Sequence, residues 1–201
     1  TVKPTDPLAV LYGGKELGPE NATNTSFGFT SSPIDNLNLT LDMYQIDIDG
    51  KILKSRSISV DDPNFSELAF YTNALDTKTS GYDLVVTYRM GNTNLSLAMN
   101  HNETEVVKQN PVNGEDPVSI GGVDNLQLNL PKDRITMSVT QNIGSALSAM
   151  VRLNYYGESW DERGVYKDHD DNPDKWNTKD KIDAVNFIDV ELSYAVSNNL
   201  N

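Results

Sequence analysis

Apolar and polar residues alternate with a period of two along much of this 201-residue chain. From residue 37, leucine or methionine takes every second position as far as Met43, and Asn38, Thr40 and Asp42 lie between them. This period places successive side chains on opposite faces of a β-strand, whereas a helical period fits almost nowhere over a useful length. The alternation predicts seven strands, which begin near residues 24, 37, 82, 95, 135, 147 and 188.

The second of these strands changes phase after Met43. Tyr44, Ile46 and Ile48 continue an apolar series, but they occupy the alternate positions, with Gln45 between the first two. A β-bulge would produce this change, and so would the passage of the strand from an apolar slab into water. The sequence leaves both explanations open.

Two kinds of connection join the predicted strands. Short turns rich in Gly, Asn, Ser and Pro occupy Ser32–Asn36, Met90–Thr93 and Asn142–Ser145. In strict alternation with them come long polar segments, at about 50–76, 103–131 and 158–181. Structureless loops of that length are uncommon in compact soluble domains. Short turns at one end and long outward loops at the other are typical of a transmembrane β-barrel.

The two faces of the predicted strands differ chemically. The apolar face carries tyrosines near strand ends, where the ring can lie at a membrane–water interface: Tyr82, Tyr88, Tyr155 and Tyr194. The opposite face carries charged residues, which belong in water. We therefore predict an all-β fold, an antiparallel up-and-down β-meander of about seven strands that forms part of a transmembrane β-barrel. A secreted β-sandwich that acts as a binding or adhesion module shares the same period and is the alternative.

Four segments resemble the barrel domain of TonB-dependent outer-membrane receptors. They are Glu16–Phe29, Ser32–Ile48, Thr72–Leu84 and Asp189–Tyr194. The first is similar to the family's "(E)L-x-PE-x-(S/T)-N-x-S-x-G-(F/Y)" start of a barrel strand, and the third to its "NA-x-x-x-x-(T/S)-x-G" returning strand. The resemblance implies that residues 1–201 are a single segment from the C-terminal part of such a barrel, in the outer membrane of a Gram-negative bacterium.

The resemblance also implies a function for the parent protein. It would import a scarce nutrient, with a ferric siderophore as the expected cargo, and would receive energy from the TonB complex through a plug domain. The chain contains neither a plug nor an energy-coupling box, and both of its ends look like cuts, so we expect the segment alone not to transport. Its expected partners are outer-membrane lipid, the rest of the barrel and the plug, and a small-molecule ligand such as a metal chelate. Unpaired edge strands and an apolar face predict that the isolated chain self-associates.

Composition narrows the function classes further. The 16 Lys and Arg against 29 Asp and Glu give a net charge of −13, which argues against nucleic-acid binding. The absence of cysteine excludes disulfides and thiolate chemistry. No nucleophile elbow, zinc-binding helix or phosphate-binding glycine loop is present, so neither an enzyme nor a cofactor is expected. A hydrophobic content of 37% suits a wall with one face toward lipid and one toward water.

The long polar segments hold the remaining candidate residues. Trp160, Tyr166 and Trp176, with Phe65, are aromatics that could contact a ligand or pack within their loops, and packing is the favoured interpretation. A second pattern resembles the start of a calcium-binding EF-hand loop, with oxygen-bearing side chains at every second position: Asp168, Asp170, Asn172 and Asp174. Pro173 and Lys179 replace the glycine and glutamate of that loop, so a solvated acidic loop is the alternative.

Overall fold

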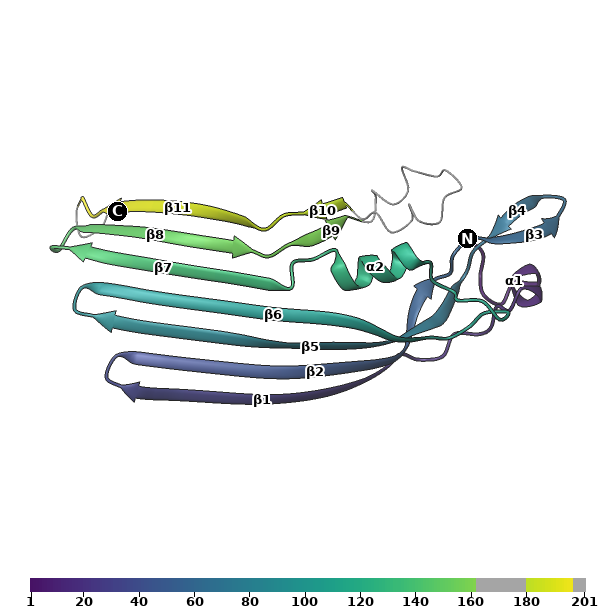
Figure 1. Cartoon of the computed structure of the whole chain (residues 1–201), viewed down its shortest axis with the longest axis horizontal. Helices are drawn as coiled ribbons and strands as arrows, with labels where there is room; N and C mark the ends of the chain where they lie inside the picture. The colour runs from purple at the N-terminus through teal and green to yellow at the C-terminus, as the bar shows by residue number, and fades with distance from the viewer. Residues whose placement is uncertain (162–179, 197–201) are drawn as a thin grey trace.

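The computed structural model describes residues 1–161 and 180–196, and its main feature is one antiparallel sheet of seven strands (Figure 1). The strands follow one another across the sheet in chain order. They are β1 (Asn21–Ile34), β2 (Leu37–Lys54), β5 (Tyr71–Met90), β6 (Thr93–Gln109), β7 (Asp133–Ile143), β8 (Leu147–Tyr156) and β11 (Val185–Tyr194). The predicted all-β meander of seven strands is confirmed.

Tight turns join β1 to β2, β5 to β6 and β7 to β8 at the same end of the sheet, the turn end (Figure 1). Each contains a residue with left-handed backbone geometry. These residues are Asn36, with φ of 65°, Gly91, with φ of 58°, and Gly144, with φ of 65°. Asn and Gly adopt that geometry at low cost, which is why the three turns can be recognised in the sequence.

The connections at the opposite end, the loop end, are shorter than predicted. The loop predicted at about 50–76 starts later and ends earlier than expected, because β2 continues to Lys54 and β5 begins at Tyr71. The loop predicted at about 103–131 starts later than expected, because β6 continues to Gln109. What remains of the loops contains its own structure: β3 (Ile58–Asp62), β4 (Phe65–Leu68), α2 (Ile120–Leu128), β9 (Ser159–Asp161) and β10 (Asp180–Ile182). The extensions escape prediction because their faces do not divide into one apolar and one polar side. The adjacent residues Ala74 and Leu75, on opposite faces of β5, are both buried at the loop end, so the sequence does not alternate there.

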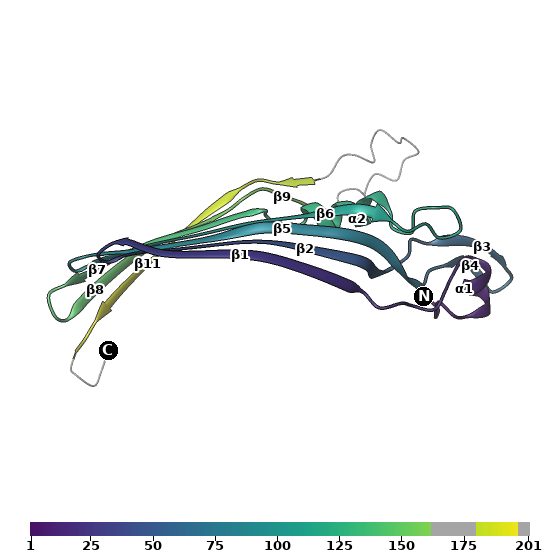
Figure 2. The ribbon, with the colours of Figure 1, turned by 90° about the horizontal axis from the view of Figure 1, so that it is seen from below.

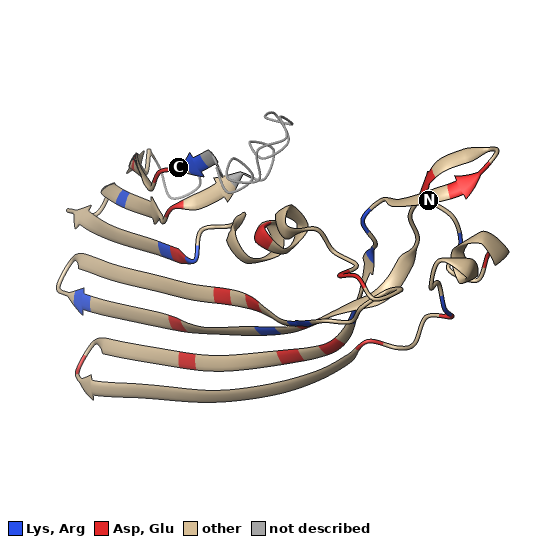
Figure 3. Cartoon of the chain, turned by 45° about the vertical axis from the view of Figure 1, so that its right-hand side comes forward, with Lys and Arg blue, Asp and Glu red and all other residues tan. Residues whose placement is uncertain are grey.

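The change of phase after Met43 is not caused by a bulge. β1 and β2 stay in continuous register through the pair Phe27 and Met43 to the pair Asn21 and Asp49. Irregular pairing between β2 and β5 begins only beyond Ile48. Above Met43 the strands instead carry charged residues on the face that is apolar below. Figure 3 shows most of the charges of β2, β5 and β6 toward the loop end, with a basic segment at the turn end of β5 and an acidic one on the turn side of β2 as exceptions. The continuous register excludes a bulge at this point, and the change of both faces agrees with the second explanation, a passage from an apolar slab into water.

The sheet is a single curved layer (Figure 2), and one of its faces is apolar and exposed. On β11 the side chains of Ile188, Val190 and Leu192 are 70%, 74% and 71% exposed. In the described residues the only other sheets are the pairs β3–β4 and β9–β10 at the loop end, so nothing covers this face. The β-sandwich alternative is therefore wrong, because a sandwich buries the apolar face of each sheet against the other. β1 and β11 form the two edges of the open sheet.

The buried apolar clusters of the described residues lie at the loop end. One joins the short helix α1 (Pro7–Leu11) to the loops through Ala9, Leu68, Phe70 and Val112. The other joins α2 to β5 and consists of Ala74, Leu75 and Val118, with half-buried neighbours that include Val106 and Leu126. In the described ranges, neither helix has the length and hydrophobicity required to cross a bilayer.

Candidate functional site

A row of polar side chains crosses the face of the sheet opposite the apolar one, which we call the inner wall. Asp42, Asp83, Asn100, Arg134 and Tyr156 lie directly opposite one another on β2, β5, β6, β7 and β8. Neighbouring strands are about 4.8 Å apart, so the Cα atoms at positions 83 and 134 are separated by roughly 10 Å. The Asn100 Nδ2 donates a hydrogen bond of 2.7 Å to Asp83 Oδ1. The row thus brings a bonded carboxylate–amide pair close to a guanidinium group.

Arg134 is held by an aromatic ring. Its Cζ lies 6.0 Å from the centroid of the Tyr156 ring, and that ring meets Phe187 edge-on with centroids 6.0 Å apart. A guanidinium over a tyrosine ring is attracted by the negative face of the ring. Within residues 1–161 and 180–196, Arg134 has no carboxylate partner. The charge is positioned without being neutralised by these residues.

A hollow of about 220 Å³ opens beside Arg134 on the inner wall. It lies between β6 and the segment that leads from α2 to β7. Its polar lining consists of Asn100, Asn102, Thr104, Gln127, Asn129 and Arg134. Gln127 Oε1 accepts a hydrogen bond of 2.8 Å from the Val106 N–H, on the part of β6 that extends beyond the start of β7. α2 thereby caps β6 there and forms one side of the hollow.

Tyr44 lies across the inner wall just above this row. It is opposite Gly81, which is in turn opposite Asn102. The Asn102 Nδ2 donates a hydrogen bond of 2.7 Å to the Tyr44 hydroxyl, over the glycine. A Cβ at position 81 would lie 2.6 Å from that hydroxyl oxygen, so only glycine leaves room for the ring. The change of phase on β2 thus places an aromatic ring in the polar wall.

Asn73 ties three segments together where β2 and β5 reach the loop end. Its Oδ1 accepts from the Gly18 N–H at 2.8 Å, while its Nδ2 donates to the carbonyls of Gly18 and Gly50 at 3.0 and 2.7 Å. Nearby, Glu20 Oε1 accepts a hydrogen bond of 2.6 Å from the Ile52 N–H, next to the irregular pairing of β2. The resemblance segments around positions 18–20 and 73 therefore have a structural role in closing the ladder.

Asp76 binds the same part of β2 as Asn73, and its surroundings favour the charged form of its carboxylate. Its Oδ1 accepts from the Gly50 N–H at 2.9 Å and from Asn110 Nδ2 at 3.2 Å, and Lys108 lies 3.8 Å away. The hydrogen bond from Gly50, followed by Asn110 and the charge of Lys108, lowers the pKa of Asp76 below its ordinary value despite partial desolvation. The bonds to the charged form thus outweigh the cost of desolvation.

Two exposed ion pairs shift pKa values in the same part of the molecule. The hydrogen bond and charge of Lys132 lower the pKa of Glu103, and those of Glu158 raise the pKa of Lys181. Both pairs are in contact with solvent, where ion pairs contribute little to stability. The two pKa shifts therefore result from local charge pairing and do not indicate a reactive site.

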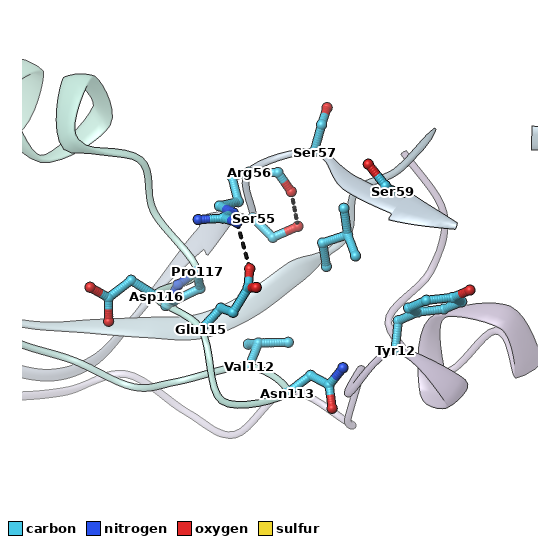
Figure 4. A pocket seen from close by; sticks show the side chains of 11 residues that line it. Tyr12, Ser55, Arg56, Ser57, Ser59, Val112, Asn113, Glu115, Asp116 and Pro117 are labelled. Atoms are coloured by element: carbon cyan, nitrogen blue, oxygen red, sulfur yellow. Dashed lines mark hydrogen bonds and ion pairs between the residues drawn. The ribbon is translucent and has the colours of Figure 1, made fainter. Parts of the chain in front are cut away.

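A second hollow, of about 290 Å³, lies among the loops (Figure 4). Arg56 and Glu115 point toward each other across it and form an ion pair of 2.5 Å. Tyr12 and Val112 add apolar surface to the lining. Ser55 is almost fully buried and bonds the main chain at Phe70, which anchors the floor of the hollow. This hollow belongs to the loops, whereas the first one belongs to the wall.

The four predicted membrane-interface tyrosines share the apolar face. Tyr82 and Tyr88 lie on β5, and the continuous pairing places Tyr155 and Tyr194 on the same side of the sheet. Tyr82 stacks on His101, with ring centroids 5.4 Å apart, in the last apolar row below the charged part of the strands. Their contact with the membrane interface remains a prediction.

The predicted loop aromatics are placed differently from one another. Trp160 is half-buried and lines a hollow together with Tyr155, so it lies near the apolar face of the wall. Phe65 is 53% exposed at the β3–β4 hairpin, which contradicts the favoured packing for this residue. Tyr166, Trp176 and the calcium candidates Asp168, Asp170, Asn172 and Asp174 lie outside the described residues. In the ranges that the structure describes, no three His, Asp or Glu side chains form a group suited to a metal ion.

Comparison with known proteins agrees with this geometry. The family described as "TonB dependent receptor-like, beta-barrel" matches residues 4–201. The chain belongs to this family. TonB-dependent receptors are outer-membrane β-barrel proteins of Gram-negative bacteria, which accounts for the apolar outer face and the polar inner wall. The family consists of receptors and transporters and not of enzymes. A comparison with curated protein sequences found no match.

Solved structures of such receptors share the fold. The iron transporter FrpB from Neisseria meningitidis (F3-3 variant) is 14% identical with a TM-score of 0.63, over 88% of this chain and 24% of its own. The copper transporter OprC is 16% identical with a TM-score of 0.60, over 98% and 26%. The siderophore receptor PirA from Acinetobacter baumannii is 14% identical with a TM-score of 0.61, over 91% and 26%. The chain thus spans about a quarter of the length of these receptors.

Proposed function

We propose that the parent protein takes up a ferric siderophore across the outer membrane, with this chain as part of the barrel wall. The observation that carries the proposal is the hollow on the inner wall, which combines amide side chains with the guanidinium of Arg134 next to the loop end. FrpB is an iron transporter and PirA is a siderophore receptor, which supports the same class of cargo.

In this proposal the two faces of the sheet have separate tasks. The apolar face contacts outer-membrane lipid, since its side chains are exposed or half-buried and uncharged through the rows between Tyr82 and Tyr88. The inner wall contacts the cargo and a plug domain from elsewhere in the parent, and the plug receives energy from the TonB complex. The chain supplies wall and rim alone, so transport requires the rest of the receptor.

The test is iron uptake by the full-length receptor in a Gram-negative host that lacks its own siderophore receptors. Cells are supplied with iron-55 as ferric chelates of the hydroxamate, catecholate and carboxylate classes. We expect energised uptake of at least one chelate, abolished by a protonophore and in a host without TonB. Uptake of labelled copper but of no ferric chelate would contradict the proposed cargo, and uptake unaffected by loss of TonB would contradict the mechanism.

A further inference from the structure

We infer that the hollow beside Arg134 is a binding subsite for an anionic oxygen group of the cargo, such as a free carboxylate on the periphery of a chelate. The inference rests on the proposed uptake function and names the class of substrate within it. It separates chelates that carry such a group from neutral chelates and from bare metal ions.

The first reason is the state of Arg134. Its guanidinium is oriented by the Tyr156 ring, yet no carboxylate among the described residues pairs with it. Asp83 lies on the same row two strands away and is bonded to Asn100 instead. An oriented arginine with vacant N–H donors matches the planar oxygen pair of a carboxylate, and the ring keeps it ready for such a partner.

The second reason is the hydrogen-bonding capacity of the rest of the lining. Asn100 and Asn102 use their Nδ2 groups on Asp83 and Tyr44, so each amide retains a carbonyl oxygen as an acceptor. Gln127 uses its Oε1 on Val106, so its Nε2 remains a donor. The hollow therefore offers one cation together with neutral amide donors and acceptors. This set suits an anionic group that is flanked by amide N–H or hydroxyl groups.

The third reason is position. The hollow faces the inner wall at β6 and β7, and its other side is α2 and the segment that leads to β7. Asn100 and Arg134 lie one position from the row of Tyr82 and His101, where the apolar band ends. A molecule arriving from the loop end therefore reaches the hollow before it has descended far along the wall. This favours cargo over a segment of the parent protein as the occupant.

The test uses two probes that differ in a single charge. One is an iron-55 complex of a linear trihydroxamate with a free terminal carboxylate, and the other is the same complex with that carboxylate converted to a primary amide. Binding and uptake are measured with the full-length receptor in the outer membrane. Arg134→Gln removes the proposed charge, and Arg134→Lys retains the charge without its planar fork. Arg152→Gln is the matched control, since Arg152 lies on the same face of neighbouring β8 but does not line the hollow.

We expect the wild-type receptor to bind the carboxylate probe about tenfold or more tightly than the amide probe, as expected for one charge-assisted contact. Arg134→Gln should abolish the preference, Arg134→Lys should retain part of it, and Arg152→Gln should retain all of it. Heat-modifiable migration of the barrel in gels verifies that each variant is folded. Equal binding and uptake of the two probes by wild type, or a preference that survives Arg134→Gln, would overturn the subsite and leave the uptake function standing. Uptake of neither probe, nor of any other ferric chelate, would contradict the uptake function, and with it the subsite.

Discussion

Tyr44 accepts a hydrogen bond of 2.7 Å from Asn102, and the two side chains meet directly over Gly81. Three neighbouring strands are thereby linked on the inner wall, at the level where the outer face changes from apolar to charged. The contact depends on the missing side chain at position 81, because a Cβ there would lie 2.6 Å from the Tyr44 hydroxyl and still closer to the main-chain oxygen of His101.

Gly81→Ala should therefore destabilise the full-length barrel. Overpacking of this kind costs about 1–3 kcal/mol, and here part of the clash is with main chain, which cannot rotate away. The measurement is the thermal midpoint of the detergent-solubilised receptor, followed by heat-modifiable migration in gels. Gly18→Ala is the control, since a Cβ there meets only Asn73 Oδ1 at an ordinary 3.8 Å. Equal midpoints for the two variants would show that the wall tolerates a side chain at position 81.

Asp76→Ala should loosen the loop end without affecting the membrane-spanning rows. The substitution leaves the Gly50 N–H without its acceptor, which costs about 1–3 kcal/mol for a buried donor and less where water can enter. Hydrogen exchange on the full-length receptor should show faster exchange at Gly50 and unchanged exchange at Leu84. Asp49→Ala, which removes an exposed carboxylate on β2 next to Gly50, is the control. Unchanged protection at Gly50 in Asp76→Ala would contradict the role of this carboxylate.

The same carboxylate predicts a pH dependence. The pKa of Asp76 is lowered from 3.8 in the folded state, so the folded protein binds this proton less readily than the unfolded chain does. Its contribution to stability is then complete above the unfolded value and is lost as the pH falls through the lower folded pKa. Protection of Gly50 from exchange, corrected for the intrinsic rate, should be constant from neutral pH to about 5 and fall below about 4. In Asp76→Asn this decline should be absent, and a decline that persists must come from another group.

The membrane contact of the outer face predicts alternating accessibility along β11. Cysteines placed singly at positions 189–192 can each carry a spin label, and the 201-residue chain has no cysteine of its own. In the full-length receptor in a bilayer, labels at Val190 and Leu192 should be relaxed by oxygen dissolved in lipid. Labels at Asp189 and Glu191 should respond to a water-soluble nickel chelate. A pattern without a period of two would contradict the assignment of the faces.

The isolated 201-residue chain should self-associate in the absence of detergent. Among residues 1–161 and 180–196, β1 and β11 are edge strands with one neighbour each. The apolar face of the sheet is exposed in the same residues, with Tyr194 60% exposed in addition to the aliphatic residues of β11. Both features promote association. Light scattering of the refolded chain in buffer should show large particles that disperse when detergent is added above its micelle concentration. A stable monomer in plain buffer would contradict this expectation.

Alternation predicted the strands where the environment differs between the two faces, and it failed where the environment is the same. From Leu37 to Met43 one face is apolar and one polar, so both the strand and its orientation could be predicted. The extension of β2 to Lys54 and the start of β5 at Tyr71 could not be predicted, because the two faces do not differ there in the same way. Ala74 and Leu75 are neighbours on opposite faces of β5, and both are buried by protein at the loop end. Helix α2 has almost no amphipathic pattern and was missed for a related reason, since it caps a strand edge instead of covering a broad core.

The candidate site depended on register, which alternation does not contain. Asn100 and Arg134 alternate with apolar residues in the sequence, which indicates the polar face, but that they are neighbours follows only from the pairing of β6 with β7. Asn73 and Gly81 stood in a segment that resembles the receptor family, which was the one signal for their importance. The structural roles of the two residues could be found only from the structure. Asn73 links main-chain groups of neighbouring segments, and Gly81 leaves space for the Tyr44 ring.

The two ends of β5 are stabilised by different surroundings, because a buried cluster encloses only its loop end. Its first residues, Ala74 and Leu75, are enclosed by protein, whereas its later residues from Tyr82 to Tyr88 depend on contact with lipid. Stripping lipid from the receptor should therefore fray the strands from the turn end, and dilute denaturant should release α1 and α2 first. A single continuous strand would then melt from opposite ends under two different treatments.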